Sequence, residues 1–177
     1  MNESSVSSAV TEDLFAGKEK ELVHLLMEMQ MKAATAESLT GGMVSARITG
    51  VPGASGVFEC GICSYSNRIK EEILGVSPQT LEVYTEYSAA CAKEMAQGVR
   101  ELSGADLGIA TTGIAGPGGG TEEKPVGTVY VGISTKNDTK AYELHLGEDN
   151  SRERNRELSA SFAIFYALAE LQAIKAS

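Results

Sequence analysis

Histidine and cysteine are scarce in this chain, although these side chains often act as catalytic bases or metal ligands. The two histidines, His24 and His145, do not adjoin any stretch that is rich in hydroxyl residues. A Ser-His pair would need distant segments to converge in the fold, so it stays an open alternative. The three cysteines are an odd number and imply no disulfide framework.

Two of the cysteines, Cys60 and Cys63, form a Cys-x-x-Cys sequence that invites a metal or redox interpretation. The surrounding segment has the pattern of a strand, on which residues three apart point to opposite faces. The second half of a zinc site is missing, because both histidines lie far away in sequence. We expect both cysteines to fill core or near-core space, and we predict no metal and no other cofactor.

Positive charge is also in short supply, with 15 Lys and Arg against 24 Asp and Glu and a net charge of -9. This balance argues against general nucleic-acid binding, although it leaves room for one local pocket for a small phosphate. Residues 1–17 lack the basic region and apolar run of a signal peptide. No stretch approaches the ~18 apolar residues of a membrane span. We therefore expect a cytoplasmic protein with no membrane partner.

A length of 177 residues favours one domain with a sizeable core. We predict a flexible leader over residues 1–12 and a folded domain over 13–177. Helices are predicted over 14–31, 41–48, 67–74, 88–102 and 151–173, and strands over 33–37, 57–65, 107–111, 126–134 and 141–146. Their alternation predicts an α/β fold, a single three-layer domain with a mixed β-sheet and helices on both faces. The last two strands supply its antiparallel part.

Two stretches, residues 35–42 and 111–120, combine small hydroxyl side chains with glycines. A hydroxyl such as that of Ser38 can attack a substrate, and a glycine lets a ligand approach the backbone closely. Neither stretch has the spacing of a Walker loop or of a Rossmann dinucleotide site. The backbone N–H groups predicted to bind an anion belong to Thr40, Gly41, Gly42, Thr112 and Gly113. Together they predict one site with a nucleophile and an anion cradle.

Lys70 is the candidate base for Ser38, because a serine is a poor nucleophile until something takes its proton. It lies in the first turns of the 67–74 helix, whose partial positive charge lowers the pKa of a lysine. Lowering that pKa from about 10.4 to about 7–8 needs roughly 3–4 kcal/mol. A helix end supplies at most ~2 kcal/mol, so burial or an arginine must supply the remainder. The alternative is a solvated surface lysine.

Other polar side chains flank these segments. Tyr65 ends the preceding strand, where it is a rim or core residue, a donor to a developing oxyanion, or a partner that orients Lys70. Arg152, Arg154 and Arg156 open the last predicted helix. They form either a solvated charged face or, through Arg152, a bidentate contact to a phosphate.

Taken together, these segments resemble the C-terminal domain of the competence/damage-inducible protein CinA. The resemblance is carried by Ala-Glu-Ser-Leu-Thr-Gly-Gly at 36–42 and Tyr-Ser-Asn at 65–67 with Lys70. It continues in the glycine stretch at 112–117 and in Glu-Lys-Pro-Val-Gly-Thr at 123–128. It covers about residues 18–172 and points to the stand-alone form, which lacks the larger N-terminal domain of fused members.

The resemblance implies a nicotinamide-nucleotide amidase without metal or cofactor, which converts nicotinamide mononucleotide to nicotinic acid mononucleotide and ammonia. It implies Ser38 as the nucleophile, Lys70 as its base and Tyr65 as a partner near the reacting carbonyl. It also implies that Thr112 contacts the substrate and that the protein is a homo-oligomer.

Two departures from the family pattern bear on these roles. Many relatives carry Cys where this chain has Leu39, which closes a thiol mechanism at that position. Arg152 matches an arginine that follows a Gly-Asp pair in the family, but the longer segment here leaves Arg154 open. The alternative functions are a non-catalytic nucleotide-binding regulatory module and an amidase for another amide.

Overall fold

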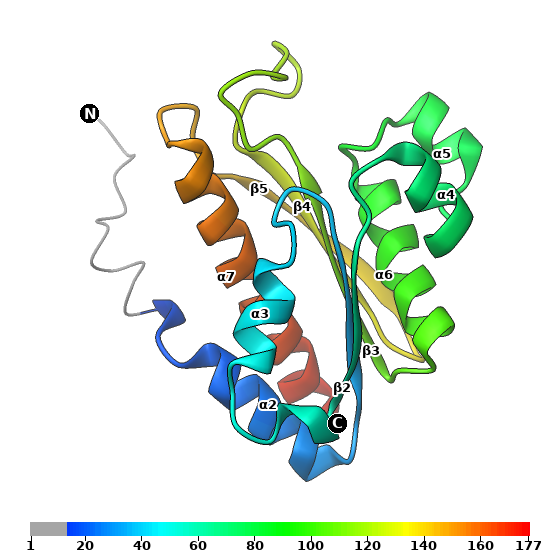
Figure 1. The fold of residues 1–177 in the computed structure, drawn as a ribbon, viewed down its shortest axis with the longest axis vertical. Helices are drawn as coiled ribbons and strands as arrows, with labels where there is room; N and C mark the ends of the chain where they lie inside the picture. Colours follow the sequence, from blue (N-terminus) through cyan, green and yellow to red (C-terminus); the bar gives the residue numbers. More distant parts are fainter. Residues whose placement is uncertain (1–13) are drawn as a thin grey trace.

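The computed structural model describes residues 14–177 as three stacked layers (Figure 1). A five-stranded sheet lies between helices α2, α3 and α7 on one face and α4, α5 and α6 on the other. This confirms the predicted α/β class with a mixed sheet and helices on both faces. The leader predicted over residues 1–12 lies outside the described residues.

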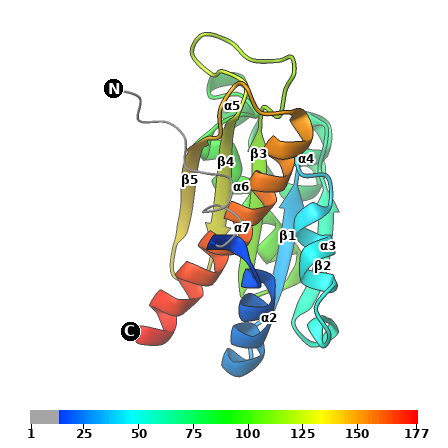
Figure 2. The same ribbon diagram turned by 90° about the vertical axis from the view of Figure 1, so that its left-hand side faces the viewer.

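The sheet has the strand order β2-β1-β3-β4-β5 (Figure 2). Its strands are β1 (Ala33–Glu37), β2 (Phe58–Cys63), β3 (Leu107–Gly113), β4 (Thr128–Ser134) and β5 (Thr139–His145). β1 pairs in parallel with β2 and β3, whereas β4 is antiparallel to β3 and β5. The carboxyl ends of the three parallel strands therefore meet at one edge of the sheet.

Serine caps begin four of the helices in the described chain. The helices are α2 (Lys18–Met29), α3 (Met43–Thr49), α4 (Asn67–Leu74), α5 (Pro78–Val83), α6 (Ala89–Ser103) and α7 (Arg152–Ala176), with a 3₁₀ turn at Ala54–Gly56. Ser66, Ser77, Ser88 and Ser151 each accept a backbone N–H at the start of α4, α5, α6 and α7. We did not predict α5, because Pro78 suggests a break. A proline is well accommodated at the first helical position, where its missing N–H has no partner to lose.

Helix α6 packs unusually close to the sheet because glycines face it. A Cβ atom on Gly132 of β4 would lie 2.1 Å from the carbonyl oxygen of Ala92, and one on Gly108 of β3 would lie 2.0 Å from that of Ala96. The core on this side of the sheet is small and rich in alanine. The core on the opposite side, under α2, α3 and α7, is larger and rich in Leu, Ile and Val.

Strand β2 differs from the prediction of a buried strand. It lies at one edge of the sheet, and its residues alternate between half-buried and exposed. Cys60 is half-buried and packs against the α6-side core, whereas the Cys63 sulfur lies near Gly42 beside α3 and is exposed. The core-filling prediction is therefore wrong for Cys63. The two thiols lie on opposite faces of the sheet and do not converge on one ligand.

Helix α7 is long and apolar enough, by length and composition alone, to cross a membrane. This differs from our expectation that no stretch approaches that limit. The helix packs against β3, β4, α2 and α3, and its buried residues include Leu158, Ile164 and Leu171. Its apolar character is thus explained by its place in the core of the domain.

Candidate active site

Ser38 and Lys70 lie in contact at the carboxyl-terminal edge of the parallel strands. Ser38 directly follows β1, and its backbone N–H donates to the Thr111 carbonyl across the sheet at 3.0 Å. Lys70 reaches in from α4, where its Nζ donates to Ser38 Oγ at 3.1 Å and to the Ser64 carbonyl at 2.8 Å. The structure therefore brings together two residues that are 32 positions apart in sequence.

The amine of Lys70 is buried, with only 1% of the residue exposed. Burial lowers its pKa, because an ammonium loses its hydration, while Cys91 and Glu86 act in the opposite direction. Burial also raises the pKa of the Cys91 thiol to about 12, so the thiol carries no charge at neutral pH. The environment thus favours the neutral amine, and the surface-lysine alternative is wrong.

A cavity of about 130 Å³ opens in front of this pair. The residues that line it come from the ends of β1, β2 and β3, from the loops around them, and from the helices α4 and α7. They are Ser38, Leu39, Tyr65, Asn67, Lys70, Glu86, Tyr87, Gly113, Ile114, Ala115, Gly116, Gly118, Gly119 and Arg152. An open groove of about 530 Å³ adjoins the cavity and shares Glu86, Tyr87, Ile114 and Gly119 with it. The cavity fits a small reacting group, and the groove leaves room for a larger ligand.

The three arginines at the start of α7 have different roles. Arg152 lines the cavity and donates to the Gly116 carbonyl at 2.8 Å and to the Tyr65 hydroxyl at 2.9 Å. Arg154 forms an ion pair with Glu157 along the helix. Arg156 donates to the carbonyls of residues 39 and 40, behind the cavity. The geometry therefore favours Arg152 over Arg154 as the arginine that faces a ligand.

Glu37, the last residue of β1, organises the turn that carries Ser38. It is 1% exposed, and its carboxylate accepts five hydrogen bonds. The donors are the Thr40 and Ser45 hydroxyls and the backbone N–H groups of Gly42, Val44 and Ser45. The carboxylate thus caps the N-terminus of α3, whose partial positive charge stabilises it.

The substrate contacts predicted for Thr40, Gly41 and Gly42 do not agree with this arrangement. None of the three is among the described residues that line the cavity. The Thr40 hydroxyl and the Gly42 N–H both donate to Glu37, at 2.6 and 2.9 Å. Gly41 and Gly42 adopt φ angles of 59° and 99°, which let the chain turn back onto that carboxylate. The Gly42 N–H, one of the predicted anion donors, is therefore already used within the turn.

Thr112 also differs from its predicted role as a substrate contact. It is fully buried, and its hydroxyl donates to the Glu86 carbonyl at 2.6 Å. It therefore holds the segment between α5 and α6 against β3. Gly113, the next residue, does line the cavity as the prediction requires.

Asn155 positions the glycine-rich loop that follows β3. It is fully buried on α7, and its side-chain amide donates to the Ala115 carbonyl at 3.2 Å. Sequence reasoning gave no role to Asn155, Glu37 or Glu86. The signal for Glu37 is an acid at the end of an otherwise uncharged strand, directly before the serine. Asn155 and Glu86 carry no comparable sequence signal.

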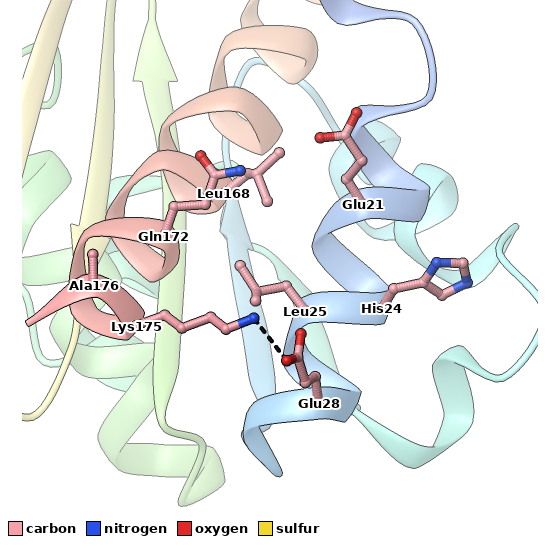
Figure 3. Close-up of a pocket in the computed structure, with 8 residues that line it drawn as sticks. All are labelled: Glu21, His24, Leu25, Glu28, Leu168, Gln172, Lys175 and Ala176. Carbon is pink, nitrogen blue, oxygen red and sulfur yellow. Dashed lines mark hydrogen bonds and ion pairs between the residues drawn. The ribbon is translucent and has the colours of Figure 1, made fainter.

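The histidines lie away from this site. His145 pairs with Glu143 on β5 at 3.3 Å. His24 borders a separate groove of about 580 Å³ between α2 and α7 (Figure 3). That groove contains the ion pair of Lys175 with Glu28, but its lining has no serine and no glycine loop. Within residues 14–177, no three His, Cys, Asp or Glu side chains are grouped to hold a metal ion.

The sequence profile of the CinA C-terminal domain matches residues 16–171. The chain belongs to the CinA C-terminal domain family. A protein of Acetivibrio thermocellus named for competence-damage induction is 48% identical over 157 residues, which are 86% of this chain and 38% of that protein. A CinA-like protein of Chlorobaculum tepidum is 55% identical over 118 residues, 67% of this chain and 28% of that protein. The chain thus spans less than two fifths of the length of these relatives.

Solved structures of CinA-family proteins share the fold along almost their whole length. The competence/damage inducible protein CihA from Agrobacterium tumefaciens has a TM-score of 0.84 and 32% identity, over 96% of this chain and 99% of that chain. A competence or damage-inducible protein from Enterobacter asburiae has a TM-score of 0.84 and 30% identity, over 89% and 98%.

Proposed function

We propose that this chain hydrolyses the carboxamide of nicotinamide mononucleotide, giving nicotinic acid mononucleotide and ammonia. The observation that carries the proposal is the 3.1 Å contact between the buried Lys70 amine and Ser38 Oγ. A lysine that loses its hydration is costly for stability, and a module that only binds nucleotides gains nothing from it. An amine with a lowered pKa beside an alcohol is instead suited to general-base catalysis.

In the first half of the reaction, neutral Lys70 takes the hydroxyl proton of Ser38 while Oγ attacks the carboxamide carbon. The C–N bond of the tetrahedral intermediate then breaks, and Lys70 returns the proton to the departing nitrogen, which leaves as ammonia. In the second half, Lys70 takes a proton from water, which attacks the acyl-serine. The acid product leaves, and Ser38 regains its proton.

The oxyanion needs donors that the structure does not already use elsewhere. Gly42 is excluded because its N–H donates to Glu37. We propose the backbone N–H of Leu39, which lines the cavity and follows the nucleophile in sequence. The Tyr65 hydroxyl, which accepts a hydrogen bond from Arg152, keeps its own proton to donate. Arg152 is proposed to bind the phosphate near the glycine-rich loop.

Ammonia release from nicotinamide mononucleotide tests this proposal directly. Ser38→Ala and Lys70→Met are each expected to reduce kcat by at least about 10³-fold. Ser55→Ala and Lys93→Ala are matched controls on the surface and should retain the full rate. A rate for Ser38→Ala equal to that of the unchanged chain would exclude the nucleophile assignment.

The alternatives predict different outcomes of the same assay. A non-catalytic regulatory module would bind the nucleotide without releasing ammonia, and an amidase for another substrate would release it only from a different member of an amide panel. We further propose that the protein acts in the cytoplasm as a homo-oligomer. The homo-oligomer rests on the family resemblance, and the cytoplasmic location carries over the expectation from the sequence.

A further inference from the structure

Glu86 places a carboxylate on the wall of the cavity, a feature that the reaction steps above do not use. It is half-buried and lines both the cavity and the adjoining groove. No ion pair involves Glu86 among residues 14–177. The nearby Lys70 amine makes no ion pair with Glu86 there, and burial lowers its pKa, which weakens its ability to offset the negative charge of Glu86.

The segment that presents Glu86 is held by Thr112, whose hydroxyl donates to the Glu86 carbonyl, and by Lys124. Lys124 donates from its Nζ to the Tyr84 carbonyl, the Thr85 hydroxyl and the Tyr87 carbonyl, at 2.9, 3.0 and 2.8 Å. Thr85 has a φ of 70°, a left-handed conformation that is strained for a β-branched residue. Such strain persists where the surroundings fix it, and it is commonly found at ligand sites.

Aromatic rings accompany this carboxylate. Tyr65 and Tyr87 line the same cavity as Glu86. Burial and the negative charge of Glu86 both raise the pKa of Tyr87, which keeps its hydroxyl protonated. The faces of tyrosine rings attract cations, and a nearby carboxylate adds to that attraction. A ligand with a neutral ring would gain no charge attraction from this combination.

We infer that Glu86, together with Tyr65 and Tyr87, selects amides carried on a positively charged ring, such as an N-substituted pyridinium carboxamide, over neutral amides. The inference rests on the proposed function and specifies its substrate class. The charge of the ring, rather than the amide alone, would then determine which compounds reach Ser38.

Binding of two ligands that differ in ring charge tests the inference. Nicotinamide mononucleotide has a cationic ring, whereas its reduced form has a neutral ring with the same amide, ribose and phosphate. Calorimetry with Ser38→Ala, which cannot turn over the amide, measures both affinities. We expect the cationic ligand to bind about tenfold more tightly, and Glu86→Gln to abolish that preference while the neutral ligand still binds.

A matched control is Glu123→Gln, which removes the same charge from the adjoining groove but not from the cavity, and it should keep the preference. Removing Glu86 also lowers the Lys70 pKa further. A less protonated amine repels a cationic ligand less, so this effect alone would strengthen binding of the cation. A reduced preference in Glu86→Gln therefore reports the lost attraction.

The outcomes separate the two proposals. Equal affinities of the two ligands, or an unchanged preference in Glu86→Gln, would overturn the inference and leave the proposed function standing. Failure of both ligands to bind, together with no ammonia release by the unchanged chain, would overturn both. If Glu86→Gln does not fold, the comparison of the two ligands on Ser38→Ala decides the question.

Discussion

The two hydroxyl-glycine segments look alike in sequence but are built differently. Residues 35–42 fold around a carboxylate of their own, because Glu37 receives donors from the turn that follows it. Residues 111–120, as the structure describes them, contain no carboxylate that accepts hydrogen bonds from its own segment. Their loop is instead fixed by side chains from α7, where Asn155 binds the Ala115 carbonyl and Arg152 binds that of Gly116.

This difference separates two tasks within one site. The first segment fixes the nucleophile locally, so its geometry depends on a few neighbouring residues. The second segment forms a wall of the cavity, and its position depends on the packing of a distant helix. Damage to the first should therefore reduce stability most, and damage to the second should mainly alter ligand binding.

Glu37→Ala should have the largest effect on stability. It leaves five buried or partly buried donors without their acceptor, and we expect the free energy of unfolding to fall by about 4 kcal/mol in urea titrations. The control Glu72→Ala removes an exposed ion pair with Arg68 and should cost at most about 0.5 kcal/mol. Similar losses in both variants would contradict the central role of Glu37.

Asn155→Ala tests how the second segment is anchored. The Ala115 carbonyl loses a buried donor, so we expect a stability loss of about 2 kcal/mol in thermal unfolding, together with a raised KM. Asn137→Ala, in the exposed turn between β4 and β5, is the control and should change neither quantity. A normal KM in Asn155→Ala would show that the loop holds its position without α7.

Arg152→Lys keeps the positive charge but loses the planar fork that reaches both Gly116 and Tyr65. We expect KM to rise about tenfold with a smaller change in kcat. Arg154→Lys, on the same helix turn but outside the cavity lining, should leave both constants unchanged. Equal effects in the two variants would remove Arg152 from the ligand site.

The pH dependence of the activity tests the pair formed by Ser38 and Lys70. Since the neutral amine is the base, activity should rise with pH through the lowered pKa of Lys70 and level off before 10.5. Glu86→Gln removes a charge that raises this pKa, so its activity profile should shift to lower pH. A profile that stays in place would contradict the coupling between Glu86 and Lys70.

The lowered pKa of Lys70 also makes the stability of the fold depend on pH. Between the lowered pKa of folded Lys70 and its ordinary value of 10.5, the unfolded chain binds more protons than the folded chain. Stability should therefore increase with pH across that window and should not depend on this group below it. Lys70→Met should remove the increase, as urea titrations at several pH values would show.

Much of the fold follows from local sequence signals. β1 and α4 have the predicted bounds, 33–37 and 67–74, because a short run of small residues before the Ser38 turn and the Ser66 cap define them locally. The six-residue helix α5 escaped prediction because Pro78 suggests a break and the helix is too short for an apolar repeat to show. The edge position of β2 depends on strand order, which alternation alone does not determine.

The site was predictable only where a residue's neighbours in sequence set its surroundings. Sequence predicted that Ser38 and Lys70 belong together, but the burial of Lys70 comes from tertiary packing that an eight-residue helix does not show. The backbone N–H of Gly42 looks available in sequence. It is occupied because the chain turns back onto Glu37, and this depends on two successive left-handed glycines.

The close packing of α6 against the sheet also affects the surroundings of Lys70. Cys91, on the first turn of that helix, lies within electrostatic range of the Lys70 amine. A methyl group at Gly132 would collide with the Ala92 carbonyl and push the helix outward. Water entering the resulting gap would hydrate the amine and weaken the effect of burial, which lowers its pKa. A glycine in the middle of β4 thus helps to keep a lysine on another element ready to accept a proton.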